Sequence, residues 1–492
     1  MGIIKKQGIN YSIVSFIGIL LGVFNILIIY PKVLKPEELG LIRTIIDAGI
    51  FLSPFLLLGV HSVAIKYFPI FKDKVSEHNG FLSFLLIYFL FGCLFFLLLF
   101  WLFKEEIYSY FANNPELYES YVVYILAITI SYSLFSLLMN YIANFKKIVV
   151  PNVFAESIKI TLPILAILFF SSIISLDVLL KCIVVHYFLI TVGLVIYLQY
   201  LKEWNFKINR SFITKNLLSQ IITFSRYSIL GSIGSVMANR IDILMVATLI
   251  NFKNTGIYTI ALTIASVINT PNSAIGNIAS PLISQAWKDN DLKQIQDIYQ
   301  KSSINLLAFG FLLFALVYFS LDDLFSIMPN GEIYKVGKPV VIILILSKLV
   351  DMATSVNGRI ILFSSFYKYN TYFLIFLSIL NVIFNYILIP IFLIKGAAMA
   401  TLLSVCLFNF IKLVFIKWKF GLYPFTNNTL KLLAILGLVF FLFYFFPSFS
   451  NPFINIILKS SCISLLYLGC LYYFNAAPEM TDMITTKIKS IL

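Results

Sequence analysis

The stretch "RYSILGSIGSVMANRIDILMVATLI" (226–250) decides the fold of this chain. It is apolar over a length sufficient to cross the hydrocarbon core of a bilayer, which is about 30 Å thick. Two charged residues, Arg240 and Asp242, interrupt it far from either end. The stretch therefore predicts a transmembrane helix with charge inside the membrane, where a charged side chain normally faces a cavity or a partner on another helix.

The rest of the chain has the same apolar character. Of its 492 residues, 60% are hydrophobic and 12% are charged, whereas about a quarter of the residues of a soluble domain are charged. We infer an all-α polytopic membrane protein, because backbone polar groups in lipid must be satisfied within each spanning segment. The net charge of +14 fits the Lys and Arg of cytoplasmic loops, and no motif suggests nucleic acid as a partner.

Apolar segments predict about fourteen transmembrane helices. They lie near 10–34, 43–68, 80–103, 121–144, 152–172, 178–200, 222–250, 257–284, 303–328, 338–362, 370–393, 396–418, 430–448 and 454–474. Pro271 and Pro281 predict bends in the eighth segment, because proline removes a backbone donor.

An internal repeat organises these segments. A shift of 216 residues places Tyr11-Ser12-Ile13 on Tyr227-Ser228-Ile229, Gly18 on Gly234 and Gly40 on Gly256, without a gap. The shift predicts a six-helix bundle over 1–215 and a second one over 216–420. Two additional transmembrane helices and a cytoplasmic tail follow over 421–492. Six spans return the chain to its starting side, so the two bundles are expected to be parallel repeats.

The charge of the loops predicts the orientation. Basic segments lie at 5–6, 72–74, 146–147, 202–215, 288–301, 368, 412–419 and 487–489, whereas the intervening loops, such as 104–120, are acidic or nearly uncharged. The excess of Lys and Arg places both termini in the cytoplasm. The segment 287–302 is interpreted as an amphipathic helix at the cytoplasmic interface.

Several motifs resemble those of a known family. "LNVIFNYILIPIFLIKGAAMAT" (380–401) resembles the Asn-x-x-Leu-Ile-Pro and Gly-Ala-Ala-x-Ala-Thr segment of bacterial polysaccharide flippases, in the multidrug/oligosaccharidyl-lipid/polysaccharide exporter superfamily. "RIDILMVATLINFKNTGIYTIA" (240–261) resembles the seventh-span pattern of that family, and "YPKVLKPEELGLI" (30–42) resembles its first loop. The likeness extends over the chain in length, span count and loop layout.

This resemblance implies a transporter rather than an enzyme, and it implies no cofactor. A member of the family would move an undecaprenyl-diphosphate-linked oligosaccharide from the cytoplasmic to the periplasmic leaflet of the bacterial inner membrane. Such transport serves surface polysaccharides such as the O-antigen of lipopolysaccharide. The implied partners are the lipid-linked substrate, the bilayer, and the polymerase and glycosyltransferases of polysaccharide assembly. The implied fold is two bundles around a cationic central cavity that opens alternately to each side.

Charged residues inside the spans are the candidate site residues. Three oppositely charged pairs stand about one helical turn apart: Arg43–Asp47, Glu156–Lys159 and Lys348–Asp351. Such neighbours either neutralise each other on one helix face or serve a ligand. Arg240 and Asp242 stand two residues apart and cannot form that pair, so each requires a partner on another helix, water or a ligand. Their repeat partners, Phe24 and Ile26, carry no charge, so the scaffold itself does not require them.

We hypothesise that Arg240 and Lys348, with Arg43, Lys66 and Lys159, line a cationic cavity for the diphosphate and the sugar acids. Guanidinium binds phosphate in a bidentate way, and ammonium binds it as a point charge. The carboxylates Asp242, Asp47 and Asp351 would pair with these cations or carry a coupling cation.

Three other functions remain open at this stage. A lipid II exporter of the same superfamily differs from a polysaccharide flippase only in family resemblance. A cation-coupled multidrug antiporter would favour a cavity of carboxylates and aromatic residues over one with surplus Lys and Arg. A membrane glycosyltransferase or polymerase would need a loop with a catalytic cluster, and the longest loops, 104–120 and 201–221, offer no carboxylate pattern for a metal.

Overall fold

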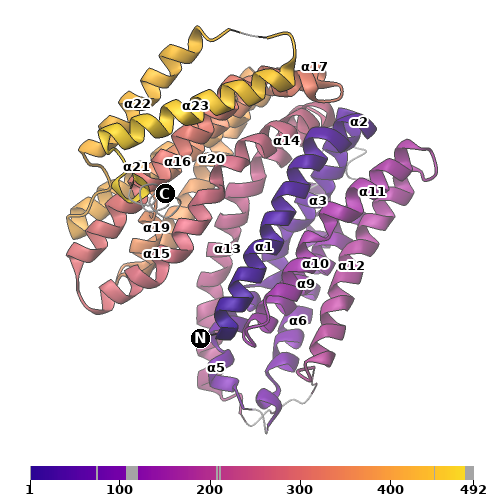
Figure 1. Cartoon of the computed structure of the whole chain (residues 1–492). Helices are drawn as coiled ribbons and strands as arrows, with labels where there is room; N and C mark the ends of the chain where they lie inside the picture. Colours follow the sequence, from indigo (N-terminus) through magenta and orange to yellow (C-terminus); the bar gives the residue numbers. More distant parts are fainter. Residues whose placement is uncertain are drawn as a thin grey trace. The chain divides into compact units, whose positions relative to one another are not determined.

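The computed structural model describes residues 2–73, 76–106, 120–204, 206, 209, 212–447 and 449–481 (Figure 1). The described residues form helices, turns and irregular segments, and no strand occurs among them. They divide into two compact units, Met1–Gly256 and Ile257–Leu492. The all-helical prediction is confirmed, and the apolar helices make the chain a multi-pass membrane protein.

The number of spans differs from the expected fourteen. Among the described residues, 12 helices are long and apolar enough to cross a membrane, or 13 if the bent pair Gly331–Thr354 and Asn357–Phe363 forms one span. The missing helix is the expected eighth span, which is broken into α14 (Phe252–Ser266), a 3-10 turn (Val267–Asn269) and α15 (Thr270–Lys288). The break directly precedes Pro271, where a bend was predicted.

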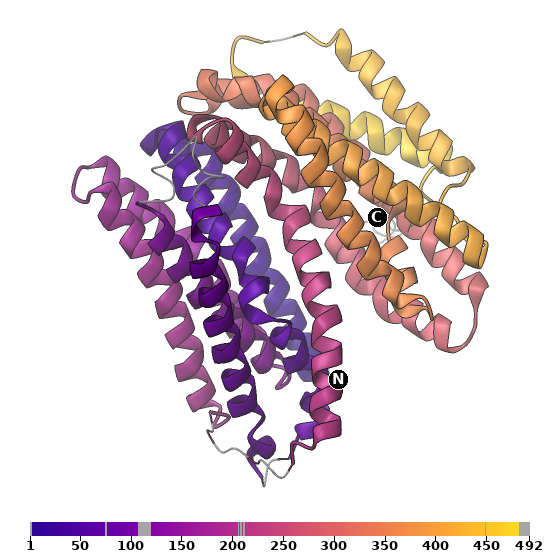
Figure 2. The ribbon, with the colours of Figure 1, turned by 180° about the vertical axis from the view of Figure 1, so that it is seen from behind.

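Unit 1 holds the N-terminal helices. They are α1 (Gly2–Phe24), η1 (Asn25–Ile29), α2 (Tyr30–Val33), α3 (Pro36–Leu57), α4 (Val60–Lys66), α5 (Phe68–Phe71), η2 (Glu77–Gly80), α6 (Phe81–Leu102), α9 (Val122–Ala143), α10 (Val149–Glu156), α11 (Ile158–Phe170), α12 (Leu176–Tyr200) and α13 (Lys215–Leu249). The π-helix η1 joins α1 to α2, so the first span is continuous. Helix α13 is a single 35-residue helix, which both views show without a break (Figure 2).

Helix α3 is the most buried of the candidate spans in the described part of the chain, and it packs against α6, α9 and α13. Pro36 occupies its first turn, and the backbone N–H of Lys35 donates to Glu38 Oε2 over 2.8 Å. Thr44 donates to the carbonyl oxygen of Gly40 over 2.7 Å, which satisfies its hydroxyl within the helix. The helix ends at Leu58 and Gly59, both in the left-handed region, before α4 begins.

Gly40 on α3 and Gly256 on α14 stand 216 residues apart, and each lies against the backbone of the other's helix. A methyl group added at Gly40 on α3 would overlap the carbonyl oxygen of Phe252 on α14. A methyl group added at Gly256 would overlap the carbonyl oxygen of Pro36. Because Pro36 and Phe252 also stand 216 residues apart, the two contacts are equivalent under the predicted repeat. Only glycine permits this approach of two backbones.

Unit 2 completes the fold with α15, α16 (Leu292–Ile327), α17 (Gly331–Tyr334), η4 (Lys335–Gly337), α18 (Lys338–Thr354), α19 (Asn357–Phe363), α20 (Tyr367–Phe392), α21 (Ile394–Phe420), α22 (Asn427–Tyr444) and α23 (Pro452–Phe474). Helices α18 and α19 meet at an angle of 46°. Ser355 lies at this bend with a φ of 49°, outside the helical region. The segment 287–302 is not one helix, because Trp287 and Lys288 end α15 and residues 292–302 form the first turns of α16; its interfacial position stays a prediction.

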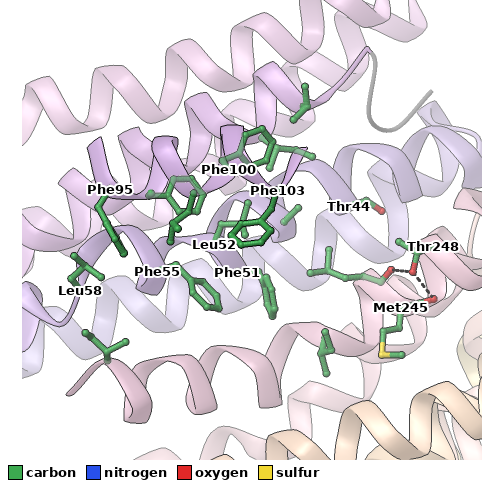
Figure 3. Close-up of a pocket in the computed structure, with 18 residues that line it drawn as sticks. Thr44, Phe51, Leu52, Phe55, Leu58, Phe95, Phe100, Phe103, Met245 and Thr248 are labelled. Atoms are coloured by element: carbon green, nitrogen blue, oxygen red, sulfur yellow. Dashed lines mark hydrogen bonds between the residues drawn. The ribbon is translucent and has the colours of Figure 1, made fainter. Parts of the chain in front are cut away.

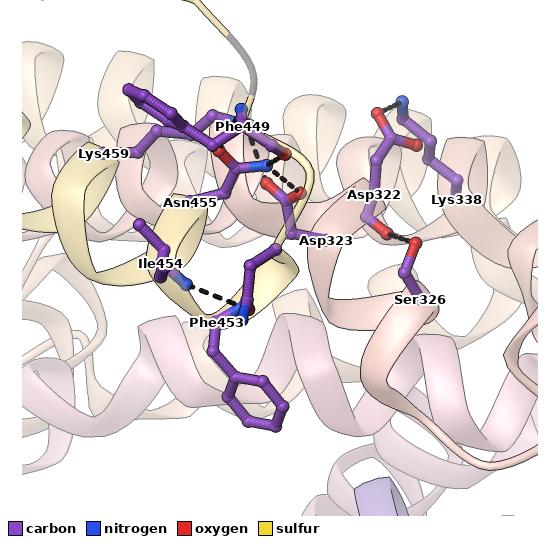
Figure 4. Close-up of polar contacts among 10 residues, drawn as sticks. Asp322, Asp323, Ser326, Lys338, Phe449, Phe453, Ile454, Asn455 and Lys459 are labelled. Atoms are coloured by element: carbon purple, nitrogen blue, oxygen red, sulfur yellow. Dashed lines mark hydrogen bonds and ion pairs between the residues drawn. The ribbon is translucent and has the colours of Figure 1, made fainter.

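The two C-terminal helices, α22 and α23, pack on α16. Asp323 of α16 forms an ion pair with Lys459 of α23 at 2.7 Å and accepts a hydrogen bond from Asn455 at 2.9 Å (Figure 4). Tyr467 adds a hydrogen bond of 2.9 Å to the carbonyl oxygen of Ala308. These buried polar contacts attach the additional helices to unit 2.

The predicted boundary between repeats, 215/216, and the boundary between compact units, 256/257, describe different properties. The first is a statement about sequence duplication and stays a prediction, whereas the second reflects contacts. In this division α13 belongs with the first six helices because it packs on α3 and α4. The predicted cytoplasmic tail beyond 481 and most of the acidic loop, 107–119, lie outside the described residues.

The reciprocal glycine contact gives a first prediction. Gly40→Ala should lower the midpoint of thermal unfolding in detergent, because the new methyl group must displace a backbone carbonyl. The matched control is Gly437→Ala on α22, where an added methyl group meets no atom within 4 Å. That control should leave the midpoint unchanged or raise it, since alanine favours a helix over glycine by about 1 kcal/mol. Equal midpoints for Gly40→Ala and the unsubstituted protein would contradict the contact.

Candidate functional site

A buried carboxylate with two arginines forms the centre of the candidate site. Asp47 on α3 has a fully buried side chain. Its Oδ2 lies 2.6 Å from Nε of Arg43, and its Oδ1 forms an ion pair and hydrogen bond with Nη1 of Arg240. We call these three residues the arginine cluster. It joins two helices, α3 and α13, which pack side by side within unit 1.

The sequence explains how the arginine cluster forms. Arg43 and Asp47 stand four residues apart on α3 and therefore share a face, as predicted. Arg240 and Asp242 project in different directions from α13, which leaves Arg240 to pair across the helix interface. Asp242 is buried on that helix. Of the three alternatives left open for Arg240, which were a partner on another helix, water or a ligand, the structure shows the first.

The arginine cluster carries surplus positive charge. Two guanidinium groups and one carboxylate have a formal net charge of +1. The side chains of Arg43 and Arg240 remain 37% and 27% exposed, so neither is sealed in the core. A guanidinium has five N–H donors, and Asp47 engages one nitrogen of each arginine. The remaining donors give this cluster the capacity to bind an anion.

The other two predicted cations of unit 1 have separate surroundings. Lys66 at the end of α4 is exposed, and its Nζ lies 3.8 Å from the ring centroid of Phe224 on α13, a cation–π contact. Lys159 forms the predicted pair with Glu156, with 2.5 Å between Nζ and Oε2. The backbone carbonyl of Lys159 also accepts a hydrogen bond of 2.6 Å from Asn25, at the π-helix of the first span.

In unit 2 the pairing of Lys348 with Asp351, one of the two alternatives that their spacing left open, is not formed. Among the described residues no carboxylate lies within ion-pair distance of Lys348, and Asp351 accepts a hydrogen bond of 2.7 Å from Asn409 instead. The side-chain amide of Asn409 on α21 donates to Asp351, while its oxygen accepts from Thr354 and Asn357. One amide thus serves three polar groups at the bend between α18 and α19.

Sequence reasoning missed the residue that completes this network. Lys412 was assigned to a basic cytoplasmic segment, yet it lies in α21 with 4% of its surface exposed. Its Nζ donates to Asn357 Oδ1 over 3.4 Å and lies 4.1 Å from the ring centroid of Phe408. Its spacing of three residues from Asn409 places both on one helix face, and this was the signal available in the sequence.

The described residues contain no group of three or more His, Cys, Asp or Glu side chains that could hold a metal ion.

The five predicted cations lie in three environments: the arginine cluster, the separate lysines of unit 1, and Lys348 in unit 2. Arg43 and Arg240 are the two that the structure brings together.

Residues 4–287 match the family described as "Polysaccharide biosynthesis protein". That stretch includes α3, α13 and the whole arginine cluster, and it is more than half of the chain. The chain belongs to this polysaccharide biosynthesis protein family. A second family, described as MatE, matches residues 228–387.

A named relative of this polysaccharide biosynthesis protein is the "Probable low-salt glycan biosynthesis flippase Agl15" of Haloferax volcanii. The two are 27% identical over 187 residues, which are 37% of this chain and 39% of the relative. The match therefore spans about two fifths of the length of that curated relative.

Two solved structures share the fold. The lipid II flippase MurJ, in an inward closed conformation, has a TM-score of 0.76 and 15% identity, covering 95% of this chain and 98% of that one. An inward-facing multidrug resistance MATE family transporter has a TM-score of 0.62 and 12% identity, covering 82% and 94%. At these identities the likeness establishes the fold of this family member.

The arginine cluster yields a second prediction. Asp47→Asn should lower the thermal midpoint, because it leaves two guanidinium groups facing each other without a carboxylate. We expect a loss of about 1–3 kcal/mol, below the 3–5 kcal/mol of a fully buried pair because both arginines are partly exposed. The double variant Asp47→Asn with Arg43→Gln should recover much of that loss, since one of the opposed charges is removed.

The control is Asp177→Asn, which breaks an exposed i,i+4 pair with Lys181 at 2.7 Å. It should change the midpoint little. A double variant no more stable than Asp47→Asn alone would show that repulsion between the arginines does not govern this site.

Proposed function

We propose that this protein flips an undecaprenyl-diphosphate-linked oligosaccharide from the cytoplasmic to the periplasmic leaflet of a bacterial inner membrane. The observation that carries the proposal is the arginine cluster, in which two guanidiniums share one buried carboxylate within membrane-spanning helices. Family membership and the likeness to a glycan biosynthesis flippase support it. The substrate would serve a surface polysaccharide such as the O-antigen of lipopolysaccharide.

The proposed chemistry is exchange of anions on arginine. A diphosphate brings oxygens that can accept paired N–H bonds from a guanidinium, whereas Asp47 contacts a single nitrogen of each arginine in the structure. Arg240 would transfer part of its hydrogen bonding from Asp47 to the diphosphate. Arg43 would continue to balance the negative charge of the Asp47 carboxylate. Such exchange avoids leaving any member of the arginine cluster as an unpaired charge in the membrane, which costs at least about 2.5–3.5 kcal/mol on insertion scales.

The remaining charged residues have proposed roles around this exchange. Lys66, Lys159 and Lys348 would attract the diphosphate and sugar acids into a cationic central cavity. Asp242 and Asp351 would carry or position a coupling cation as the two bundles alternate in access. Both termini would lie in the cytoplasm, near the polymerase and glycosyltransferases that process the substrate.

A second candidate, export of lipid II, is favoured by one observation, the fold shared with MurJ over nearly the whole chain. Lipid II is also a lipid-linked diphosphate, so the arginine cluster suits both substrates. The family that matches residues 4–287 favours the polysaccharide substrate. A multidrug antiporter would handle cationic compounds, for which the surplus positive charge of the arginine cluster is unsuited.

A third prediction tests transport directly. Arg240→Gln should reduce export of the lipid-linked oligosaccharide by about tenfold to a hundredfold, the range for losing a charge-assisted hydrogen bond of about 1.5–3 kcal/mol. Arg240→Lys should be intermediate, because ammonium keeps the charge but not the paired geometry. The measurement is mass analysis of lipid-linked sugars and surface polysaccharide in a strain that lacks the native copy.

Arg226→Gln is the matched control, since Arg226 lies on the same helix with an exposed side chain. It should retain most of the export at an equal protein level. Unchanged export with Arg240→Gln at an unchanged protein level would refute the proposed role. Accumulation of a substrate that lacks one sugar would instead indicate a transferase, and accumulation of lipid II would indicate the second candidate.

A further inference from the structure

An apolar groove of about 630 Å³ lies among α3, α6, α9 and α13 of unit 1. Its volume is within the range of roughly 300–1,000 Å³ found for sites that bind small molecules. Six phenylalanines form much of its wall: Phe51, Phe55, Phe95, Phe96, Phe100 and Phe103. Figure 3 labels all of them except Phe96. Because aromatic rings are rigid and bulky, the groove has a defined shape rather than a collapsible one.

The two threonines of the groove do not make it polar. The Thr44 hydroxyl donates to the carbonyl oxygen of Gly40 at 2.7 Å. The Thr248 hydroxyl lies 3.0 and 3.3 Å from the carbonyl oxygens of Leu244 and Met245 (Figure 3). Since both hydroxyls donate to their own helix, the groove is suited to hydrocarbon rather than to sugar.

The groove adjoins the arginine cluster through the same two helices. On α3, the lining residues Thr44 and Ala48 directly follow Arg43 and Asp47 in the sequence. On α13, Arg240 stands eleven residues after Ile229 and four before Leu244, both of which line the groove. These spacings return to one helix face, so Arg240 lies along the edge of the groove-lining face.

We infer that this groove holds part of the isoprenoid chain of the transported lipid while the arginine cluster holds its diphosphate. The inference rests on the proposed function and adds a second binding element to it. An amphiphile with an anionic head and an apolar chain matches the two adjacent features in charge and in polarity. Because a lipid chain gains no hydrophobic free energy on leaving the bilayer, its selection depends on packing against the aromatic wall and on anchoring of the head.

The closing experiment is photo-cross-linking in nanodiscs with the full chain. The probe is a polyprenyl diphosphate with a diazirine on the isoprenoid chain, and peptide mass spectrometry locates the adducts. We expect adducts on the lining segments of α3 and α6, around Phe51 and Phe95. A second probe, a water-soluble prenyl diphosphate with a short chain, measures binding of the head alone by thermal shift.

Two lining substitutions, Ala48→Phe and Leu99→Trp, fill the groove. They should lower the yield of groove adducts by about tenfold, equivalent to roughly 1.4 kcal/mol of lost contacts, and leave the thermal shift with the short probe unchanged. The matched control is Leu94→Trp, on the same helix but 70% exposed and outside the groove lining. This variant should leave the adduct yield and the thermal shift unchanged. It also tests whether α6 tolerates an added tryptophan without loss of folding.

The two proposals fail in different ways. Adducts spread over exposed helix faces, or unchanged in the filled variants, would overturn the groove inference, as would an equal pattern from a phospholipid with a diazirine on its acyl chain. If the short probe binds and Arg240→Gln abolishes that binding, the proposed function stands whatever the adduct pattern shows. Absence of any thermal shift with the short probe would count against the proposed function itself.

Discussion

The fold of unit 1 depends on neutralising one carboxylate, Asp47, inside a membrane. An unpaired charge at this depth costs several kilocalories per mole, and the cost is met here by two arginines from two helices. One of them, Arg43, belongs to the same helix and would suffice for neutrality. The second, Arg240, makes the arginine cluster net positive and fixes α13 against α3. Structural pairing and surplus charge are therefore properties of the same contact.

Helix α3 also takes part in the close approach between repeats. Gly40 and Gly256 allow the backbones of α3 and α14 to approach closely. Gly40 faces the carbonyl oxygen of Phe252, and Gly256 faces that of Pro36. Under the predicted repeat the two glycines correspond to each other, whereas the charged residues Arg240 and Asp242 correspond to the uncharged Phe24 and Ile26. This asymmetry distinguishes Arg240 and Asp242 from the two glycines. The arginine cluster and the apolar groove both lie on α3 and α13.

Hydrophobic length was sufficient to predict most of the helices, because a membrane requires long apolar segments whatever their neighbours. At 257–284 the expected span is not confirmed, because the 3-10 turn before Pro271 divides this segment between α14 and α15. For the site, spacing alone placed Arg43 and Asp47 on one helix face and left Arg240 to a partner on another helix, water or a ligand. Spacing could not identify Asp47 as the shared partner, since that depends on how α3 and α13 pack. The same limitation applies to Lys348, because Asp351, its possible partner by spacing, is bonded to Asn409 from a helix distant in sequence.

The most direct test of the central claim is an experimental structure of the protein in a nanodisc with its lipid-linked oligosaccharide bound. The account predicts density for the diphosphate within hydrogen-bond distance of the guanidinium groups of Arg240 and Arg43. A diphosphate bound elsewhere, with Arg240 still paired only to Asp47, would contradict it.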